Sequence, residues 1–162
     1  MVTREMDTTI QAWTETKWRV SSYLVHMESL PVGDMEGHTV GIFSRRGLAF
    51  FETGEVGIFQ NWGTLDIMPG ETSFQNCAQY TALYTFDDGS TMVLKGQATS
   101  EPGPKGLPLY KGEGEFTKGT GRFEGIKGTA SFTGSGTVYS KEKGILADAY
   151  FDFTATYALP PK

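Results

Sequence analysis

The chain has 162 residues and a formal net charge of −5 at pH 7, and 38% of its residues are hydrophobic. A chain of this length buries about 70% of the surface that it exposes when unfolded, which is enough for one domain with its own core. The sequence lacks the cluster of basic residues that is typical of a nucleic-acid-binding protein. No apolar run approaches the roughly 18 residues that are needed to cross a bilayer. We therefore expect a single globular domain over 1–162, with neither nucleic acid nor membrane as partner.

One cysteine and two histidines limit the chemistry that the chain can support. Cys77 has no partner for an internal disulfide, and acidic residues stand near the N-terminus where a signal peptide has an apolar run, which predicts a cytoplasmic protein. The Cys and His residues do not follow zinc-site spacing, and the Walker, GxGxxG, HExxH and GxSxG patterns are absent from the sequence. We expect no metal and no cofactor.

A polar N-terminal extension, 1–16, is followed by short segments rich in Thr, Val, Tyr and Phe that Gly, Pro and Asp separate. This rhythm is typical of β-strands. Asp88-Gly89 is a strong hairpin signal, whereas three prolines in 101–108 predict a loop. The predicted strands are 17–28, 38–44, 47–59, 72–86, 90–100, 109–117, 127–139 and 147–158. Eight antiparallel strands predict an all-β fold, a single closed barrel, because closure removes the exposed sheet edges.

Alternation within two of these strands distinguishes their faces. One face of 72–86 carries Tyr80 and Tyr84, and one face of 147–158 carries Phe151 and Phe153. Successive side chains of a strand point to opposite sides, so we expect these aromatic faces to pack inside the barrel. An eight-stranded barrel leaves room for side chains or for one small ligand.

His26 and Glu28 are separated by one residue, so within a regular strand they share a face at a distance of about 6–7 Å. A histidine near its working pH and a carboxylate form a general acid–base pair. The alternative is that this face is the solvated outside of the strand. Tyr84 and Tyr80 offer phenols that donate to an oxyanion, although a buried tyrosine more often only packs.

Glu52 directly follows the apolar run that ends at Phe51. Turned inward, this carboxylate would be costly to bury and would mark a functional site; turned outward, it belongs to a polar surface. Trp62 follows two amide side chains at a strand end, where it either orients a ligand at the barrel rim or plugs the barrel.

The stretch from Tyr110 to Thr133 joins a strand to the turn GTGRFEG, Gly119 to Gly125, and then to a second strand from Gly128. It resembles the G-x-G-x-F-x-G turn of the allene oxide cyclase and dirigent β-barrels. The aromatic hairpin at 84–90 and the AYFDF segment at 149–153 are similar to further parts of these barrels. The resemblance covers about the C-terminal 90 residues and implies a calycin-like barrel, often trimeric, with an apolar cavity and no cofactor.

The resemblance also implies roles for individual residues. Cyclases of that family use a carboxylate on the first strand to steer a reactive intermediate, and Glu28 is the nearest match by position. The family's neighbouring asparagine is not found there, because Ser29 and Leu30 follow. Dirigent relatives guide phenoxy radicals made by another oxidase and carry acidic cavity residues, to which Glu28 or Asp152 corresponds loosely.

Three functional hypotheses follow from the sequence. The first is a cofactor-independent isomerase, cyclase or lyase acting on a small hydrophobic substrate in the barrel cavity; the second is a carrier barrel that binds such a molecule without chemistry. A third is an assembly module that forms a homo-oligomer, a dimer or trimer, through an apolar face. The expected catalytic residues are Glu28, His26 and Tyr84, and the expected ligand-binding residues are Glu52, Trp62, Tyr80 and Phe51.

Overall fold

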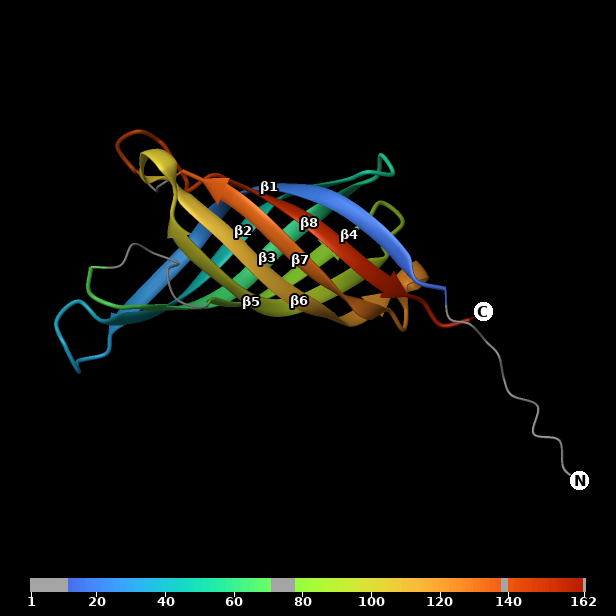
Figure 1. The fold of residues 1–162 in the computed structure, drawn as a ribbon, viewed down its shortest axis with the longest axis horizontal. Coiled ribbons are helices and arrows are strands. Elements are labelled where there is room, and N and C mark those ends of the chain that lie inside the picture. The colour runs from blue at the N-terminus through green and yellow to red at the C-terminus, as the bar shows by residue number, and fades with distance from the viewer. Residues whose placement is uncertain (1–11, 71–77, 138–139, 162) are drawn as a thin grey trace, which may run out of the picture.

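The computed structural model describes residues 12–70, 78–137 and 140–161. Each strand pairs antiparallel with the next along the chain, and the last pairs with the first, so the sheet closes into a barrel (Figure 1). The strands are β1 (Thr14–Pro31), β2 (Thr39–Phe51), β3 (Val56–Ile67), β4 (Ala78–Thr85), β5 (Thr91–Pro102), β6 (Pro108–Thr120), β7 (Lys127–Gly136) and β8 (Ala149–Ala158). Two short 3-10 helices, Pro104–Gly106 and Gly121–Phe123, lie in connections. The predicted all-β, closed eight-stranded barrel is confirmed.

The predicted break between 38–44 and 47–59 is wrong, because β2 continues through Gly47. A Cβ on Gly47 would lie 1.9 Å from the Ser21 carbonyl oxygen of β1. This glycine therefore marks a close approach of two backbones inside the sheet and not a turn. The turn that ends β2 lies further on, where the Gly54 N–H donates to the Phe51 carbonyl at 2.9 Å.

The predicted proline loop is shorter than expected. Pro102 and Pro108 are register partners, so the loop between β5 and β6 contracts to residues 103–107. Both prolines stand at strand ends, where the missing N–H removes no interior ladder bond. The hairpin at Asp88-Gly89 is confirmed, with Gly89 at a φ of 82°.

The half of the barrel nearest the start of β1 is filled by stacked aromatic rings, and we call it the packed half. The Trp18 ring lies 5.0 Å from the Phe153 centroid and 5.1 Å from that of Phe51. The Trp18 indole N–H donates to the Tyr84 hydroxyl at 3.3 Å. Aromatic pairs at these distances contribute about 0.5–1.5 kcal/mol each beyond their buried area. These contacts pack the Trp18, Tyr84 and Phe153 rings against one another.

The GTGRFEG turn closes this end of the barrel through Arg122. Its guanidinium pairs with Glu55 of the β2–β3 turn and lies 3.4 Å from Asp88 of the β4–β5 turn. It also covers the rings of Phe86 and Phe123, at 4.9 and 4.7 Å from their centroids. One arginine thus joins three hairpins, so the signature turn has a structural role here.

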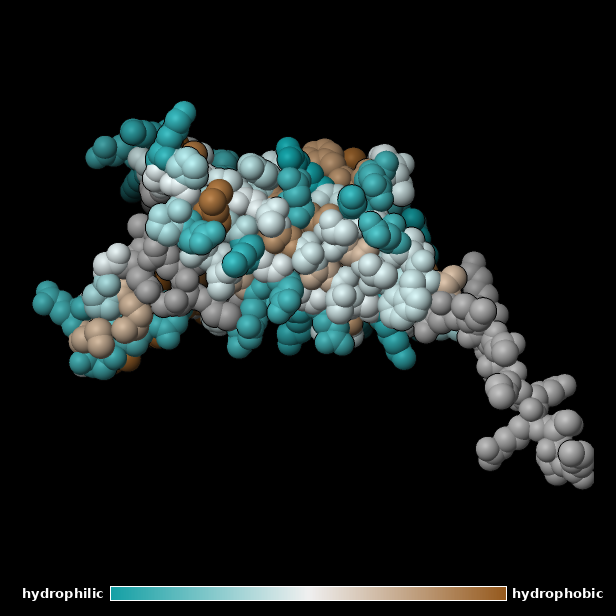
Figure 2. All heavy atoms as spheres, in the orientation of Figure 1, coloured by the Kyte–Doolittle hydropathy of each residue, from teal (hydrophilic) through white to brown (hydrophobic). Residues whose placement is uncertain are grey.

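The outer face of β6, β7 and β8 is covered mainly by hydrophilic and neutral residues (Figure 2). Outward positions of β8 alternate with buried ones, as in Asp152, Phe153, Thr154 and Ala155. This confirms the predicted faces of the last strand. Among the described residues, no helix is long and apolar enough to cross a membrane.

Gly47→Ala tests the close approach of β1 and β2. We expect it to lower the free energy of unfolding by about 2–3 kcal/mol, because a backbone carbonyl cannot yield to the new Cβ as a side chain would. Gly57→Ala is the matched control, since its Cβ would meet the Phe86 ring at 3.3 Å. Urea unfolding measures the free energy of unfolding of both variants. Equal losses of stability would contradict a close approach of the two backbones at Gly47.

Candidate functional site

A small cavity lies inside the other half of the barrel. It leaves about 40 Å³ for the centre of a water-sized sphere. One water needs roughly 10–15 Å³ by this measure, so the space exceeds a single water. Its walls are aromatic side chains with a few polar groups: Phe43, Arg45, Phe59, Asn61, Tyr80, Ala82, Ala98, Tyr110, Phe132, Phe151 and Phe153.

Pairs of phenylalanine and glycine shape this cavity. Phe43 stands opposite Gly63 in the β2–β3 ladder, and Phe132 stands opposite Gly112 in the β6–β7 ladder. A Cβ on either glycine would lie 2.5 Å from the ring opposite. Each ring therefore lies against a bare stretch of backbone. Alternating large and small residues in this way fills a barrel wall without filling its centre.

Arg45 is the charged residue of the cavity wall, and it is only 4% exposed. Its Nε donates to Ser22 Oγ at 3.1 Å, and its Nη2 donates to the carbonyl oxygens of Ser22 and Ala147, at 3.3 and 2.6 Å. The guanidinium lies 5.7 Å from the Phe151 ring centroid. Within the described parts of the chain, no carboxylate forms an ion pair with it.

Burial lowers the pKa of the Arg45 guanidinium, while Tyr110 and Asp148 act in the opposite direction. Arginine nevertheless stays charged in proteins. A buried cation that is only partly satisfied is costly, so an anionic oxygen entering the cavity would be stabilised there.

Ala147, whose carbonyl oxygen accepts a hydrogen bond from Arg45, has an unusual backbone conformation. Its φ is +50°, a left-handed conformation that costs an alanine about 1–2 kcal/mol. The carbonyl oxygen of Ala147 accepts the shortest hydrogen bond of Arg45. Strain of this kind persists where surrounding structure holds it and gathers at functional sites.

Asn61 carries the second polar group of the wall. Its Oδ1 is fully buried and has no hydrogen-bond partner among the described residues. Buried polar atoms are nearly always paired, and leaving one unpaired costs about 1–3 kcal/mol. Asn61 and Arg45 are direct register partners on β3 and β2, so both polar groups lie on adjacent strands of one wall.

Of the two tyrosines expected at the site, the structure places Tyr80 in the cavity wall and Tyr84 in the packed half. The Tyr80 hydroxyl donates to the Glu113 carbonyl at 3.1 Å. Burial raises the pKa of Tyr80 and that of Tyr84 above the ordinary value of a phenol. Both phenols therefore stay protonated near neutral pH.

His26 and Glu28 lie on the outside of the barrel, with side chains 56% and 67% exposed and 3.1 Å apart. The register between β1 and β2 shifts between Leu24 and His26. One extra residue in a strand flips every later side chain to the other face. Hence Trp18, Val20 and Ser22 point inward, but their even-numbered successors His26 and Glu28 do not. The expectation that this pair faces a cavity is not met.

The other expected residues also lie away from the cavity. Glu52 is exposed, and its carboxylate accepts the Lys17 N–H at 3.2 Å. Trp62 is 46% exposed on the outer surface, and Phe51 is stacked in the packed half. Cys77 lies outside the described residues. Of the predicted ligand-binding set, the structure brings only Tyr80 to the cavity.

Sequence reasoning missed Arg45 and Asn61, although a signal for the first was present. Residues Phe43, Arg45, Gly47 and Ala49 share one face of β2, and on this face Phe43 and Ala49 are apolar and buried. A charged residue within an apolar face is the signal. The false break placed at the two arginines concealed it.

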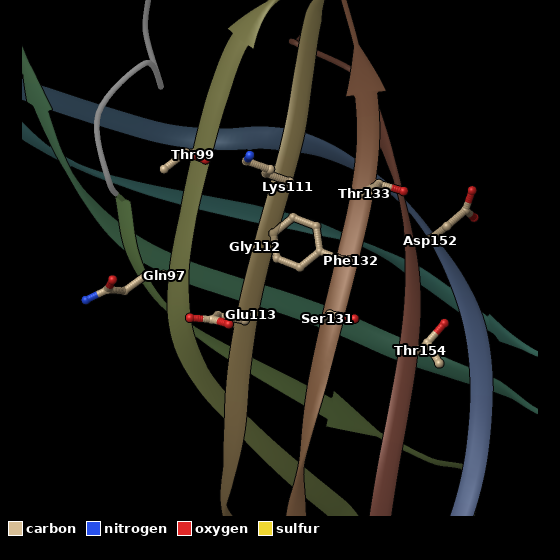
Figure 3. A pocket seen from close by; sticks show the side chains of 10 residues that line it. All are labelled: Gln97, Thr99, Lys111, Gly112, Glu113, Ser131, Phe132, Thr133, Asp152 and Thr154. Carbon is tan, nitrogen blue, oxygen red and sulfur yellow. The ribbon is translucent and has the colours of Figure 1, made fainter.

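Larger depressions lie on the outer surface of the barrel and at the end of its packed half, where Phe51, Phe86 and Phe123 line one of them. Figure 3 shows one over β5 to β8, where Gln97, Lys111, Thr133 and Asp152 point away from the sheet. The buried Phe132 ring lies against Gly112. The polar groups of this depression are solvated and spread over several strands. It lacks the enclosure that small-molecule sites require. The interior cavity is the stronger candidate.

No protein-family model matches the chain, and no curated protein matches its sequence. Among solved structures, the chain is similar to the pterocarpan synthase dirigent protein GePTS1, with a TM-score of 0.52 and 16% identity over 99% of this chain and 96% of that chain. The fold is a dirigent-like barrel. This likeness agrees with the dirigent-like barrel that the sequence resemblance implied and does not show an allene oxide cyclase. At this identity the likeness concerns the fold alone.

At the cavity end of the dirigent-like barrel, His38 joins the β1–β2 connection to β3. Its two ring nitrogens lie 2.7 Å from carboxylate oxygens of Asp34 and Asp66. Hydrogen bonds to Asp66, and then to Asp34, raise the pKa of His38 above its ordinary value of 6.5. Among the described residues, no cluster of His, Cys, Asp and Glu could hold a metal ion.

Because the pKa of His38 is raised in the folded state, its stabilising contribution is fully present below about pH 6.5 and is lost as the pH rises through the folded pKa. We expect Asp66→Asn to lower the pKa of His38 and to reduce this dependence. NMR titration of the His38 ring measures its pKa, and urea unfolding over the same pH range measures the dependence of stability. Glu36→Gln, in the same connection, is the control; an unshifted His38 in Asp66→Asn would refute the bridge.

Proposed function

We propose that this dirigent-like barrel binds a small, flat organic molecule in its interior cavity and holds it in one orientation. The observation that carries the proposal is the buried Arg45, which stands in an aromatic wall without an ion-pair partner among the described residues. Aromatic walls with a few placed polar groups are the usual composition of small-molecule sites.

The size of the cavity limits the ligand. Drug-sized ligands occupy pockets of roughly 300–1,000 Å³. The 40 Å³ available to the centre of a water-sized sphere is far smaller, although adding the radius of that sphere enlarges the true space. Apolar cavities of about 150 Å³ bind benzene in other proteins. A body of one ring therefore suits this cavity.

Binding is better supported than acid–base catalysis. The ionisable groups in the described cavity wall are one arginine and the tyrosines Tyr80 and Tyr110, and burial raises the pKa of both phenols. None of these groups transfers protons readily near neutral pH. An isomerase or cyclase at this site would act mainly by orienting its substrate. The neighbour named as a dirigent protein and pterocarpan synthase supports a barrel that acts on small organic molecules.

Filling the cavity tests this function. Ala98→Leu places three more carbons into the cavity wall, so we expect it to weaken binding of benzyl alcohol at least tenfold. Gln97→Leu is the matched control, because Gln97 is the next residue and points to the outside. Chemical-shift titration of the alcohol measures both. Unchanged affinity in Ala98→Leu would place binding elsewhere.

We also propose that the barrel self-associates through the outer face of β2 and β3. Leu48 stands opposite Ile58, and Phe50 stands opposite Val56. These four side chains point outward and are 45%, 39%, 45% and 41% exposed, respectively. A contiguous patch of exposed apolar side chains is typical of a surface that contacts another protein. A second copy of the chain, as a dimer or trimer, would cover it.

The double variant Leu48→Lys/Ile58→Lys tests the apolar face. We expect it to weaken self-association about tenfold or more, because it places two charged side chains in the proposed interface. Sedimentation velocity over a range of concentrations measures this. Thr154→Lys, on the polar face of β8, should leave the assembly unchanged. A wild-type protein that remains monomeric at all concentrations would contradict the proposal.

A further inference from the structure

We propose that Arg45 and Asn61 form a recognition pair for a one-ring aromatic acid that also carries a hydroxyl group. The inference rests on the proposed binding function and specifies its ligand. It depends on which hydrogen-bonding groups of the cavity wall remain unused.

Arg45 has unused donors that suit a carboxylate. Its Nε and both hydrogens of Nη2 are engaged by Ser22 and by the Ala147 carbonyl. The two N–H groups of Nη1 have no acceptor among the described residues. All three acceptors in use are neutral oxygens, so the positive charge itself is not neutralised by contact. A carboxylate oxygen would satisfy both the donors and the charge, and such charge-assisted bonds are about twice as strong as neutral ones.

Asn61 has the opposite need. Its buried Oδ1 is an acceptor without a donor in the described chain, and a carboxylate alone cannot supply one. A hydroxyl group can. The wall therefore calls for a ligand with two different oxygens, one that accepts from Arg45 and one that donates to Asn61.

The spacing and the walls favour an aromatic body between these two oxygens. Cβ atoms of directly opposed residues in an antiparallel pair lie about 4.5–5.5 Å apart, so one small molecule spans Arg45 and Asn61. On β7 and β8, the Phe132 ring packs beside those of Phe153 and Phe151 in the cavity wall, with ring centroids 4.8 and 5.5 Å away. A flat ring packs well among such rings. A carboxylate and a hydroxyl in meta positions fit the separation.

The experiment uses four probes that separate charge from hydroxyl: 3-hydroxybenzoate, benzoate, 3-hydroxybenzyl alcohol and benzyl alcohol. Affinities for the wild-type chain are measured by NMR titration and calorimetry. We expect 3-hydroxybenzoate to bind best. Each acid should bind at least tenfold more tightly than its matching alcohol, and each hydroxylated probe several-fold more tightly than its parent.

Two variants assign these preferences to their residues. Arg45→Met keeps much of the side-chain volume and should abolish the preference for acids while leaving the preference for the hydroxyl. Asn61→Leu should do the reverse. The controls are Arg46→Met and Gln60→Leu, which change the neighbouring residues on the opposite strand faces and should retain both preferences. A residue that only stabilised the fold would alter all four affinities alike.

Three outcomes would overturn the inference. Equal binding of acids and alcohols by the wild type would refute recognition of a carboxylate but would leave the proposed binding function intact. This result does not depend on whether any variant folds. Equal binding of hydroxylated and parent probes would likewise refute recognition of a hydroxyl group by Asn61. Failure of all four probes to bind would refute the proposed function itself.

Discussion

Closure of the sheet is the constraint on which the other features depend. β1 pairs with both β2 and β8, so each strand has two neighbours and every side chain points either into the barrel or out of it. An open sheet could move a polar residue toward an edge, whereas a closed one cannot. The number of side chains inside the barrel is therefore fixed. Which side chains these are follows from the alternation along each strand. Stacked rings fill one half, and Phe–Gly pairs leave a small space in the other.

A single irregularity in β1 separates the external acid–base pair from the internal cavity. The shift between Leu24 and His26 changes the face of all later residues in the strand. Without it, His26 and Glu28 would continue the inward row of Trp18, Val20 and Ser22. With it, their side chains contact each other on the outer surface, and the polar character of the interior comes instead from β2 and β3.

The interior of the barrel combines an apolar environment with a charge that the neighbouring carbonyls only partly satisfy. Burial of a guanidinium is costly, and the left-handed backbone at Ala147 adds to that cost. Packing alone would favour an apolar side chain at Arg45. A group retained at such a cost is consistent with a binding role, and the nearby unpaired oxygen of Asn61 points the same way. The packed half thus stabilises the barrel, and in the proposed function the other half selects the ligand.

The sequence by itself determined the fold class, because alternation such as Phe151, Phe153 and Ala155 and turns such as Asp88-Gly89 act over a few residues. It also predicted the inward position of Tyr80. Only the tertiary structure decided the face of His26 and Glu28, since a bulge depends on pairing with another strand and leaves no local signal. Likewise, Arg45 and Asn61 are 16 positions apart in the chain and meet only because β2 and β3 pair in one register. A site made of cross-strand neighbours is a property of that register, which no single strand encodes.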